Sequence, residues 1–200
     1  MRLRDKQKEM VRNALIEAGM ALFESQGLAE TTIDQITQAA GVGKGTFYNY
    51  FETKEDLLVA GMAIMQEKET SLAELDVLRP ATLREKLDLL IDWSAAWIKA
   101  HPKLSLSWSL ERLRRGLEDQ SPKSFDGHLR AIILSGQQSG ELRSDRPCDQ
   151  ILLEMTALFV FAIACWVHRD REYDLAAAIK DSIRTYITGA KGNRNGGFEE

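Results

Sequence analysis

Residues 31–54 read as two short helices joined by a tight turn, and this pattern constrains the fold of the N-terminal region. Thr32 and Gln35, three residues apart, fit a capping box at the start of the first helix. Gly41 stands where a short helix must turn sharply, a position that favours a positive φ angle. The second helix is expected over about 44–50. Two helices joined in this way predict a helix-turn-helix.

The second of these helices has one face for the core and other faces for a partner. Phe47 and Phe51 are four residues apart and are expected to point into the core. Polar side chains on the other faces suit a DNA major groove, and glycines near the helix start let the backbone come close to DNA. The residues expected at DNA are Lys44, Gly45, Thr46, Tyr48 and Asn49.

The rest of the chain has the composition of an ordinary globular helical protein. Hydrophobic residues make up 44% and charged residues 28%, prolines are few, and alternating strand-like runs are nearly absent. These features predict an all-α fold of about nine helices. We expect a three-helix helix-turn-helix domain at 1–54, a helical ligand-binding and dimerisation domain at 55–190, and a disordered Gly/Asn-rich tail at 191–200.

Charge and cysteine content indicate a cytoplasmic protein. The net charge of −4 lies beyond residue 54, and an acidic total does not exclude phosphate binding at a local face. Residues 1–12 are charged and unlike a signal peptide. The longest apolar run, Met155–Val167, is shorter than the about 20 residues of a membrane span. Cys148 and Cys165 are isolated and are expected to be reduced.

Two late helices, expected over about 148–168 and 173–188, are candidates for self-association. The first is apolar nearly all round from Met155 to Trp166, so it must be covered on two sides. Together they predict a four-helix interface with a second copy of the chain. Burial within one chain is the alternative.

Aromatic residues on the middle helices suggest a pocket for a small hydrophobic or aromatic effector. Core packing is the alternative for each of them. Arg112 and Arg115 could receive an anionic ligand, although Glu111 and Glu118 beside them favour a solvated face. The candidate pocket residues are Trp93, Trp97, Trp108, Phe125, Phe159 and Trp166.

One dense run carries a family resemblance. Gly27 is followed by TTIDQITQAAGV at 31–42 and GKGTFYNYFETKEDLL at 43–58. This run resembles the tetracycline-repressor (TetR) family of bacterial regulators, and the specific part of the match covers about the first 60 residues. Beyond it, only the helix layout and the QQSGEL segment at 137–142 are similar.

The resemblance implies a homodimer that binds a near-palindromic operator, usually represses, and is released by a small ligand. By motif position it assigns the DNA contacts of the recognition helix to Lys44, Thr46, Tyr48 and Asn49. It assigns phosphate contacts at the starts of the two flanking helices to Thr32 and Lys54, and a mixed packing and phosphate role to Tyr50. Chemically, Lys44 suits guanine, Asn49 adenine, and the Thr46 methyl group a thymine methyl.

The resulting prediction is a DNA-binding transcriptional regulator, most simply a repressor, with no cofactor or metal. A helical dimeric adaptor or ligand-binding protein without sequence-specific DNA binding is the alternative, and it would leave Lys44, Tyr48 and Lys54 unexplained. An enzyme is a weaker rival because the chain has no Gly-rich phosphate loop, HExxH or CxxC motif. The three histidines lie far apart in the sequence, which argues against a metal-binding or catalytic cluster; they are His101, His128 and His168.

Overall fold

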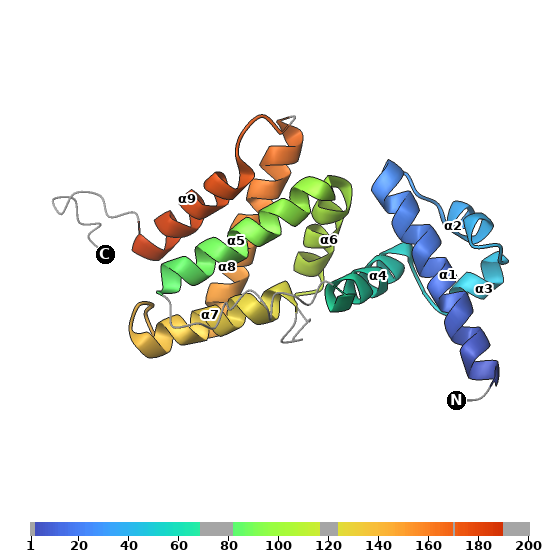
Figure 1. Ribbon diagram of the computed structural model, residues 1–200, viewed down its shortest axis with the longest axis horizontal. Coiled ribbons are helices and arrows are strands. Elements are labelled where there is room, and N and C mark those ends of the chain that lie inside the picture. The colour runs from blue at the N-terminus through green and yellow to red at the C-terminus, as the bar shows by residue number, and fades with distance from the viewer. Residues whose placement is uncertain (1–2, 69–81, 117–123, 170, 190–200) are drawn as a thin grey trace. The chain divides into compact units, whose positions relative to one another are not determined.

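The computed structural model describes residues 3–68, 82–116, 124–169 and 171–189. Over these residues the chain forms nine helices and no strand, so the predicted all-α fold is confirmed (Figure 1). The tail expected at 191–200 lies outside the described residues. The helices are α1 (Leu3–Gln26), α2 (Ile33–Ala39), α3 (Lys44–Tyr48), α4 (Lys54–Lys68), α5 (Leu83–Ala100), α6 (Pro102–Arg114), α7 (Phe125–Ser139), α8 (Cys148–His168) and α9 (Leu175–Thr188).

The helices belong to two compact units. Unit 1 contains α1 to α4, α6 and residues 98–100 at the end of α5, whereas unit 2 contains the rest of α5 with α7, α8 and α9. Helix packing therefore groups α4 and α6 with the N-terminal helices. The boundary expected after residue 54, between a DNA-binding domain and a ligand-binding and dimerisation domain, stays a prediction.

Unit 1 is built around α1, which contacts α2, α4 and α6. Figure 1 shows α2 and α3 together on one side of α1. Glycines allow α1 and α4 to approach closely: a Cβ atom on Gly19 would lie 2.5 Å from the Leu57 side chain, and one on Gly61 would collide with Met20. Because Leu57 is fully buried, these small residues bring α4 directly onto the core of the unit.

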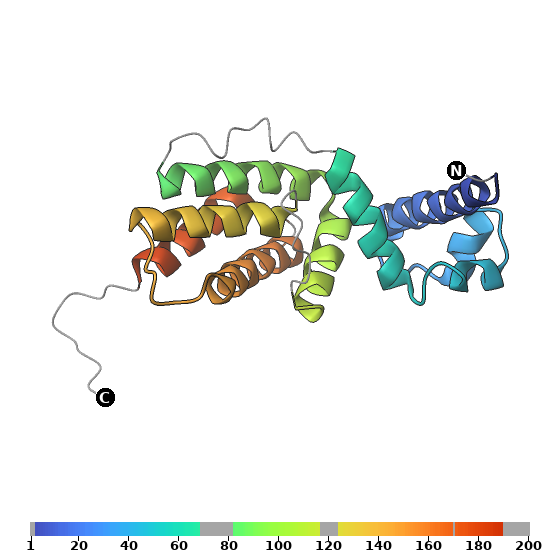
Figure 2. The ribbon, with the colours of Figure 1, turned by 90° about the horizontal axis from the view of Figure 1, so that it is seen from below.

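Unit 2 has α8 at its centre, in contact with both α7 and α9. Figures 1 and 2 both show α5 running alongside α7. Gly136 of α7 fits against α5 because a Cβ atom there would lie 2.9 Å from the Leu83 side chain. The core of the unit is aliphatic and aromatic, with Leu90, Leu129 and Ile179 fully buried.

Helix α8 has the bounds that the sequence predicted, Cys148–His168. It has 21 residues, and by length and composition alone it could cross a membrane, with a mean hydropathy of 2.0 over its most apolar stretch. Half of that stretch is buried inside the protein. Leu153, Ala157 and Phe161 are exposed apolar residues of α8. They are spaced four residues apart, so they form a stripe along one face of the helix, and Phe161 is 69% exposed.

Candidate DNA-binding interface

The turn between α2 and α3 has the conformation that the sequence indicated. Gly41 adopts a φ of 68°, in the left-handed region that favours glycine. Its N–H donates to the carbonyl of Gln38 at 3.2 Å, and the Val42 N–H donates to the carbonyl of Thr37 at 3.0 Å. The chain therefore leaves α2 through a short, hydrogen-bonded turn and enters α3 at once, as a helix-turn-helix requires.

The start of α2 is fixed by the predicted capping box. The Gln35 N–H donates to the Thr32 hydroxyl at 3.2 Å, and the Thr32 N–H donates to the Gln35 side-chain oxygen at 2.8 Å. The neighbouring Thr31 is buried, and its hydroxyl donates to the carbonyl of Gly27 at 2.7 Å. Both threonines thus stabilise the corner between α1 and α2, and Thr32 stays exposed.

Two phenylalanines anchor α3 to unit 1, as predicted. Phe47 is fully buried and Phe51 is 6% exposed, with their ring centroids 5.7 Å apart. The guanidinium of Arg12 on α1 lies 5.7 Å from the centroid of the Phe51 ring, a cation–π contact that the sequence did not indicate. These contacts fix the orientation of α3 on the unit.

The opposite side of α3 is open. Lys44, Gly45, Tyr48 and Asn49 are exposed, whereas Thr46 is half-buried. A Cβ atom on Gly45 would meet nothing within 4 Å, so protein packing does not require glycine here and the backbone is accessible. Helix α3 ends at Tyr48, slightly earlier than predicted, with Asn49 as its C-cap, and Tyr50 beyond it is half-buried.

Two of the exposed side chains have partners in the protein. The Lys44 ammonium lies 2.9 Å from the Asp34 carboxylate, with both side chains more than half exposed, and this contact raises the pKa of Lys44 through the hydrogen bond from its ammonium to Asp34. Such an exposed ion pair is weak, so Lys44 can exchange Asp34 for a nucleic-acid acceptor at small cost. The Tyr48 ring meets the Phe47 ring edge-on at 5.5 Å, which holds it at the helix surface.

Lys54 has a structural role that the sequence did not reveal. Its ammonium donates to the carbonyls of Leu28, Ala29 and Thr31, at 2.7, 3.1 and 2.9 Å. An ammonium group has three donors, so all of them are used within the protein. Lys54 ties the start of α4 to the α1–α2 corner, and its predicted phosphate contact would have to compete with these three carbonyls.

Helix α4 begins with a second reciprocal cap. The Thr53 N–H donates to the Asp56 carboxylate at 2.9 Å, and the Asp56 N–H donates to the Thr53 hydroxyl at 3.1 Å. Thr53 therefore caps α4. Because Thr53 lies two residues after Phe51, the cap fixes the path of the chain from α3 into α4.

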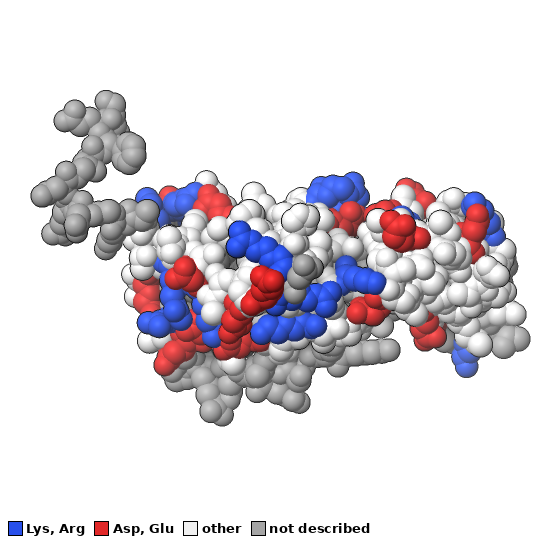
Figure 3. All heavy atoms as spheres, turned by 90° about the horizontal axis from the view of Figure 1, so that it is seen from above, with Lys and Arg blue, Asp and Glu red and all other residues white. Residues whose placement is uncertain are grey.

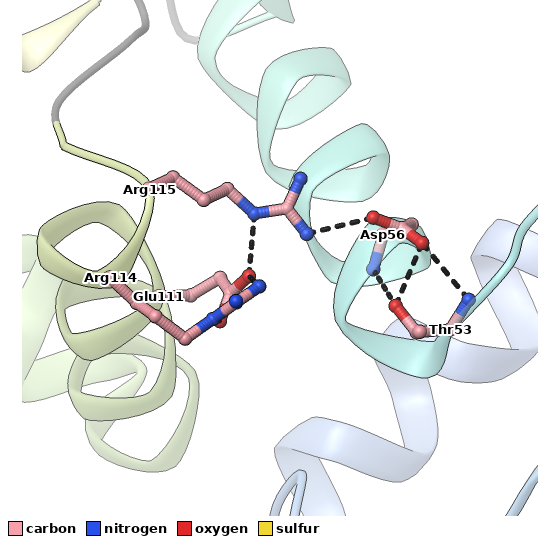
Figure 4. A network of polar contacts seen from close by, with 5 residues as sticks. All are labelled: Thr53, Asp56, Glu111, Arg114 and Arg115. Carbon is pink, nitrogen blue, oxygen red and sulfur yellow. Dashed lines mark hydrogen bonds and ion pairs between the residues drawn. The ribbon is translucent and has the colours of Figure 1, made fainter.

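The same Asp56 carboxylate binds α6 (Figure 4). The Arg115 guanidinium donates to it at 2.8 Å and donates to Glu111 at 2.5 Å. Arg114 also donates to Glu111, at 2.8 and 2.6 Å, and Glu111 is only 6% exposed. We call these residues, with Thr53, the α4–α6 network. Arg115, considered from the sequence as a possible receiver of an anionic ligand, instead joins α6 to the cap of α4.

The α4–α6 network favours the ionised carboxylates. Hydrogen bonds from Arg114 and then Arg115 lower the pKa of Glu111, although burial opposes them. Burial also acts to raise the pKa of Asp56, but the hydrogen bonds from Arg115 and Thr53 outweigh it and the pKa is lowered. Carboxyls with a depressed folded-state pKa contribute stability above their unfolded pKa, and this contribution is lost as the pH falls through the folded pKa.

We expect Glu111→Gln to lower the free energy of unfolding at pH 7 by about 1–2 kcal/mol, because a buried carboxylate with two arginine partners becomes a neutral amide. The variant should also lose less stability than the parent as the pH falls below about 4. Urea unfolding at several pH values measures both effects. Glu17→Gln, at an exposed position of α1, is the control and should change neither. Equal acid sensitivity of parent and Glu111→Gln would contradict the assignment.

The predicted pocket aromatics do not all come together. Phe125 and Phe159 meet edge-to-face in unit 2, with ring centroids 5.0 Å apart, whereas Trp108 belongs to unit 1. The Trp166 indole N–H donates to the Tyr173 carbonyl at 3.1 Å, so this residue has a clear role in the connection between α8 and α9. Trp93 and Trp97, the remaining candidates, are half-buried on α5.

A groove that the sequence did not indicate lies between α5 and α9. It has a volume of about 270 Å³ and an apolar floor that includes Leu87 and Ile183. Its basic rim is neutralised locally: the Lys180 ammonium lies 2.6 Å from Asp92, and the Arg184 guanidinium lies 3.3 Å from Asp88. Basic and acidic residues also lie next to one another on the face of unit 2 drawn in Figure 3.

Comparison with known proteins shows that the chain is similar to bacterial transcriptional regulators. Residues 15–60 match the model of a family described as bacterial regulatory proteins, tetR family. The chain is 26% identical over 189 residues to the fatty acid metabolism regulator protein of Bacillus subtilis (strain 168), covering 92% of this chain and 97% of that protein. It is also 26% identical over 187 residues to the probable acrEF/envCD operon repressor of Escherichia coli (strain K12), covering 86% and 84%.

A solved structure is similar over nearly its whole length. The transcriptional regulator FadR from Bacillus subtilis, crystallised in complex with stearoyl-CoA, superimposes with a TM-score of 0.64 and 25% identity, covering 88% of this chain and 98% of that chain. The similarity therefore extends beyond the matched residues 15–60 into the helices of unit 2.

Proposed function

Because the chain belongs to the tetR family of bacterial regulatory proteins and is a DNA-binding transcriptional repressor, we propose that a long-chain acyl thioester of coenzyme A releases it from DNA. The observation that carries this proposal is the full-length similarity to the Bacillus subtilis regulator of fatty acid metabolism and to a FadR structure containing stearoyl-CoA. This proposal is more specific than the prediction from the sequence, which was a small hydrophobic or aromatic effector. We also propose a cytoplasmic, non-enzymatic role.

The interior of unit 2 supports an acyl ligand. Its buried residues on α5, α7 and α8 are largely aliphatic, and the Phe125–Phe159 pair lies between α7 and α8. An acyl chain gains free energy mainly by leaving water for such surroundings, and pockets of this kind use few polar groups to orient the ligand.

The reading residues are proposed from exposure and chemistry. Lys44, Tyr48 and Asn49 are exposed on or next to α3, and Gly45 leaves the backbone open. We assign base contacts to Lys44 and Asn49, and phosphate or sugar contacts to Tyr48 and to Thr32, whose helix start is exposed. Thr46 and Tyr50 are half-buried and are proposed to contact DNA only at their outer edges.

A homodimer is proposed through α8 and α9. The apolar stripe of α8 contains Phe161, 69% exposed, and Leu153, 47% exposed, one above the other on the helix surface. A large exposed apolar surface on a long helix is typical of a subunit interface. Two copies then present two reading helices, and the operator is expected to contain two half-sites related by the same twofold symmetry.

The test measures DNA affinity with and without the ligand. We expect stearoyl-CoA to weaken binding of the protein to the DNA upstream of its own gene by about 5- to 150-fold, the usual range of allosteric coupling. Coenzyme A without the acyl chain should have no effect, because the apolar part supplies the binding energy. Fluorescence anisotropy with labelled DNA measures both.

Each outcome of this test has a distinct meaning. Specific DNA binding that stearoyl-CoA does not change would overturn the ligand assignment and leave the repressor function intact. The absence of any specific DNA complex at low salt, from a protein that still dimerises, would favour the helical adaptor instead.

A further inference from the structure

Thr156, in the middle of α8, has an unusual hydroxyl group. It is fully buried, and among the described residues its oxygen is the one buried side-chain nitrogen or oxygen with no hydrogen-bond partner. A buried polar group without a partner destabilises a protein, so native structures retain few of them and each requires an explanation.

Other buried hydroxyls in this chain are satisfied by backbone carbonyls. Ser94 on α5 donates to Ile91 at 3.0 Å, Thr37 on α2 donates to Asp34 at 3.1 Å, and Ser105 on α6 donates to a carbonyl one helical turn before it. Helical Ser and Thr side chains commonly form this bond. The Thr156 hydroxyl lacks it, so its oxygen is available to another partner.

The neighbours of Thr156 along α8 are apolar. Leu152, Phe159 and Ile163 are buried at positions one or two turns away on the same side of the helix. Phe159 contacts Phe125, so this side of α8 faces α7. A buried water needs two to four polar partners, and these neighbours supply none. A ligand that brings its own hydrogen-bond acceptor into an apolar site fits better.

We propose that the Thr156 hydroxyl donates a hydrogen bond to the thioester carbonyl oxygen of the acyl ligand. This inference rests on the ligand class proposed above. An acyl thioester has one strong acceptor where the apolar chain meets the coenzyme, and a hydroxyl within an apolar wall recognises that point. Thr156 therefore determines specificity: it distinguishes an acyl thioester from an equally long ligand that has no carbonyl.

The experiment combines a change in the protein with a change in the ligand. The Thr156→Val variant keeps the shape of the side chain and removes the hydroxyl, and S-octadecyl-coenzyme A keeps the chain and removes the carbonyl. Isothermal titration of both proteins with stearoyl-CoA and with this thioether gives four affinities. We expect the wild type to prefer the thioester, and Thr156→Val to lose about three- to tenfold of affinity for the thioester but little for the thioether.

Matched variants exclude a general effect on folding. Thr156→Ser keeps the hydroxyl and should keep the preference for the thioester. Ser94→Ala removes a hydroxyl that is already satisfied and should leave the ratio of the two affinities unchanged. Thermal unfolding without ligand should show Thr156→Val to be at least as stable as the wild type, because an unpaired polar group has been removed.

The failure of this inference differs from the failure of the proposed function. If the wild type binds stearoyl-CoA and Thr156→Val changes both affinities equally, the hydroxyl does not bind the carbonyl and the inference is overturned. If the wild type binds neither ligand, the acyl-CoA assignment itself is wrong, and the inference falls with it.

Discussion

Tyr48→Ala is expected to reduce operator affinity by at least about 30-fold and to leave the helical fold and the subunit association unchanged. Tyr48 is 52% exposed on α3, and its ring meets the Phe47 ring edge-on, which leaves the hydroxyl end at the surface. A hydrogen bond to a charged group such as a phosphate contributes about 1.5–3 kcal/mol, and the proposed dimer contains two copies of it. Fluorescence anisotropy with operator DNA measures the loss.

Two further variants identify the source of this effect. Tyr48→Phe keeps the contact with Phe47 and removes only the hydroxyl, so any loss of affinity reports a hydrogen bond to DNA. Met10→Ala, at a 71% exposed position of α1, is the control for a general surface change and should bind normally. Normal operator binding by Tyr48→Ala would show that α3 does not enter the groove as proposed.

Phe161→Glu is expected to produce monomers and to lower operator affinity by about 100-fold or more. A carboxylate at the C-terminal end of the α8 stripe would have to be desolvated in the proposed apolar interface between two copies. Separate monomers lose the gain from two linked reading helices, which can reach about 10²- to 10⁴-fold. Sedimentation velocity measures the association state, and a gel shift with the operator measures affinity.

The control for Phe161→Glu makes the same chemical change elsewhere. Leu134 on α7 is 42% exposed and lies outside α8 and α9, so Leu134→Glu should remain dimeric and bind DNA. If Phe161→Glu stays dimeric, the interface does not involve the α8 stripe. If it becomes monomeric but binds DNA as tightly as the parent, the two reading helices do not act together.

The helix-turn-helix formed by α2 and α3 could be predicted because its determinants are local. The capping box at Thr32 and Gln35 spans four residues of sequence, and the positive φ of Gly41 follows from the short turn that contains it. Phe47 and Phe51 share a helix face because they are four residues apart. Each of these features depends on backbone geometry within one or two turns, which a sequence pattern contains.

Long-range polar contacts could not be predicted. Arg115 and Asp56 are 59 residues apart, and their pairing depends on how α6 lies against α4. From the sequence, the arginines at the end of α6 fit a solvated face equally well. The unpaired state of Thr156 is also invisible in the sequence, because it depends on the packing of α8 in three dimensions. The pocket aromatics illustrate the same limit, since Trp108 and Phe125 lie in different units.

The three carbonyls that hold Lys54 have a consequence for the thermodynamics of operator binding. A lysine that neutralises a DNA phosphate displaces a condensed counterion, and each such contact steepens the fall of affinity with salt concentration. An ammonium that stays with Leu28, Ala29 and Thr31 displaces none. If Lys54 keeps these bonds on DNA, we expect binding to depend more on hydroxyl, amide and backbone donors than on counterion release, and the affinity to fall less steeply with salt concentration than two phosphate-binding lysines, Lys44 and Lys54, would cause.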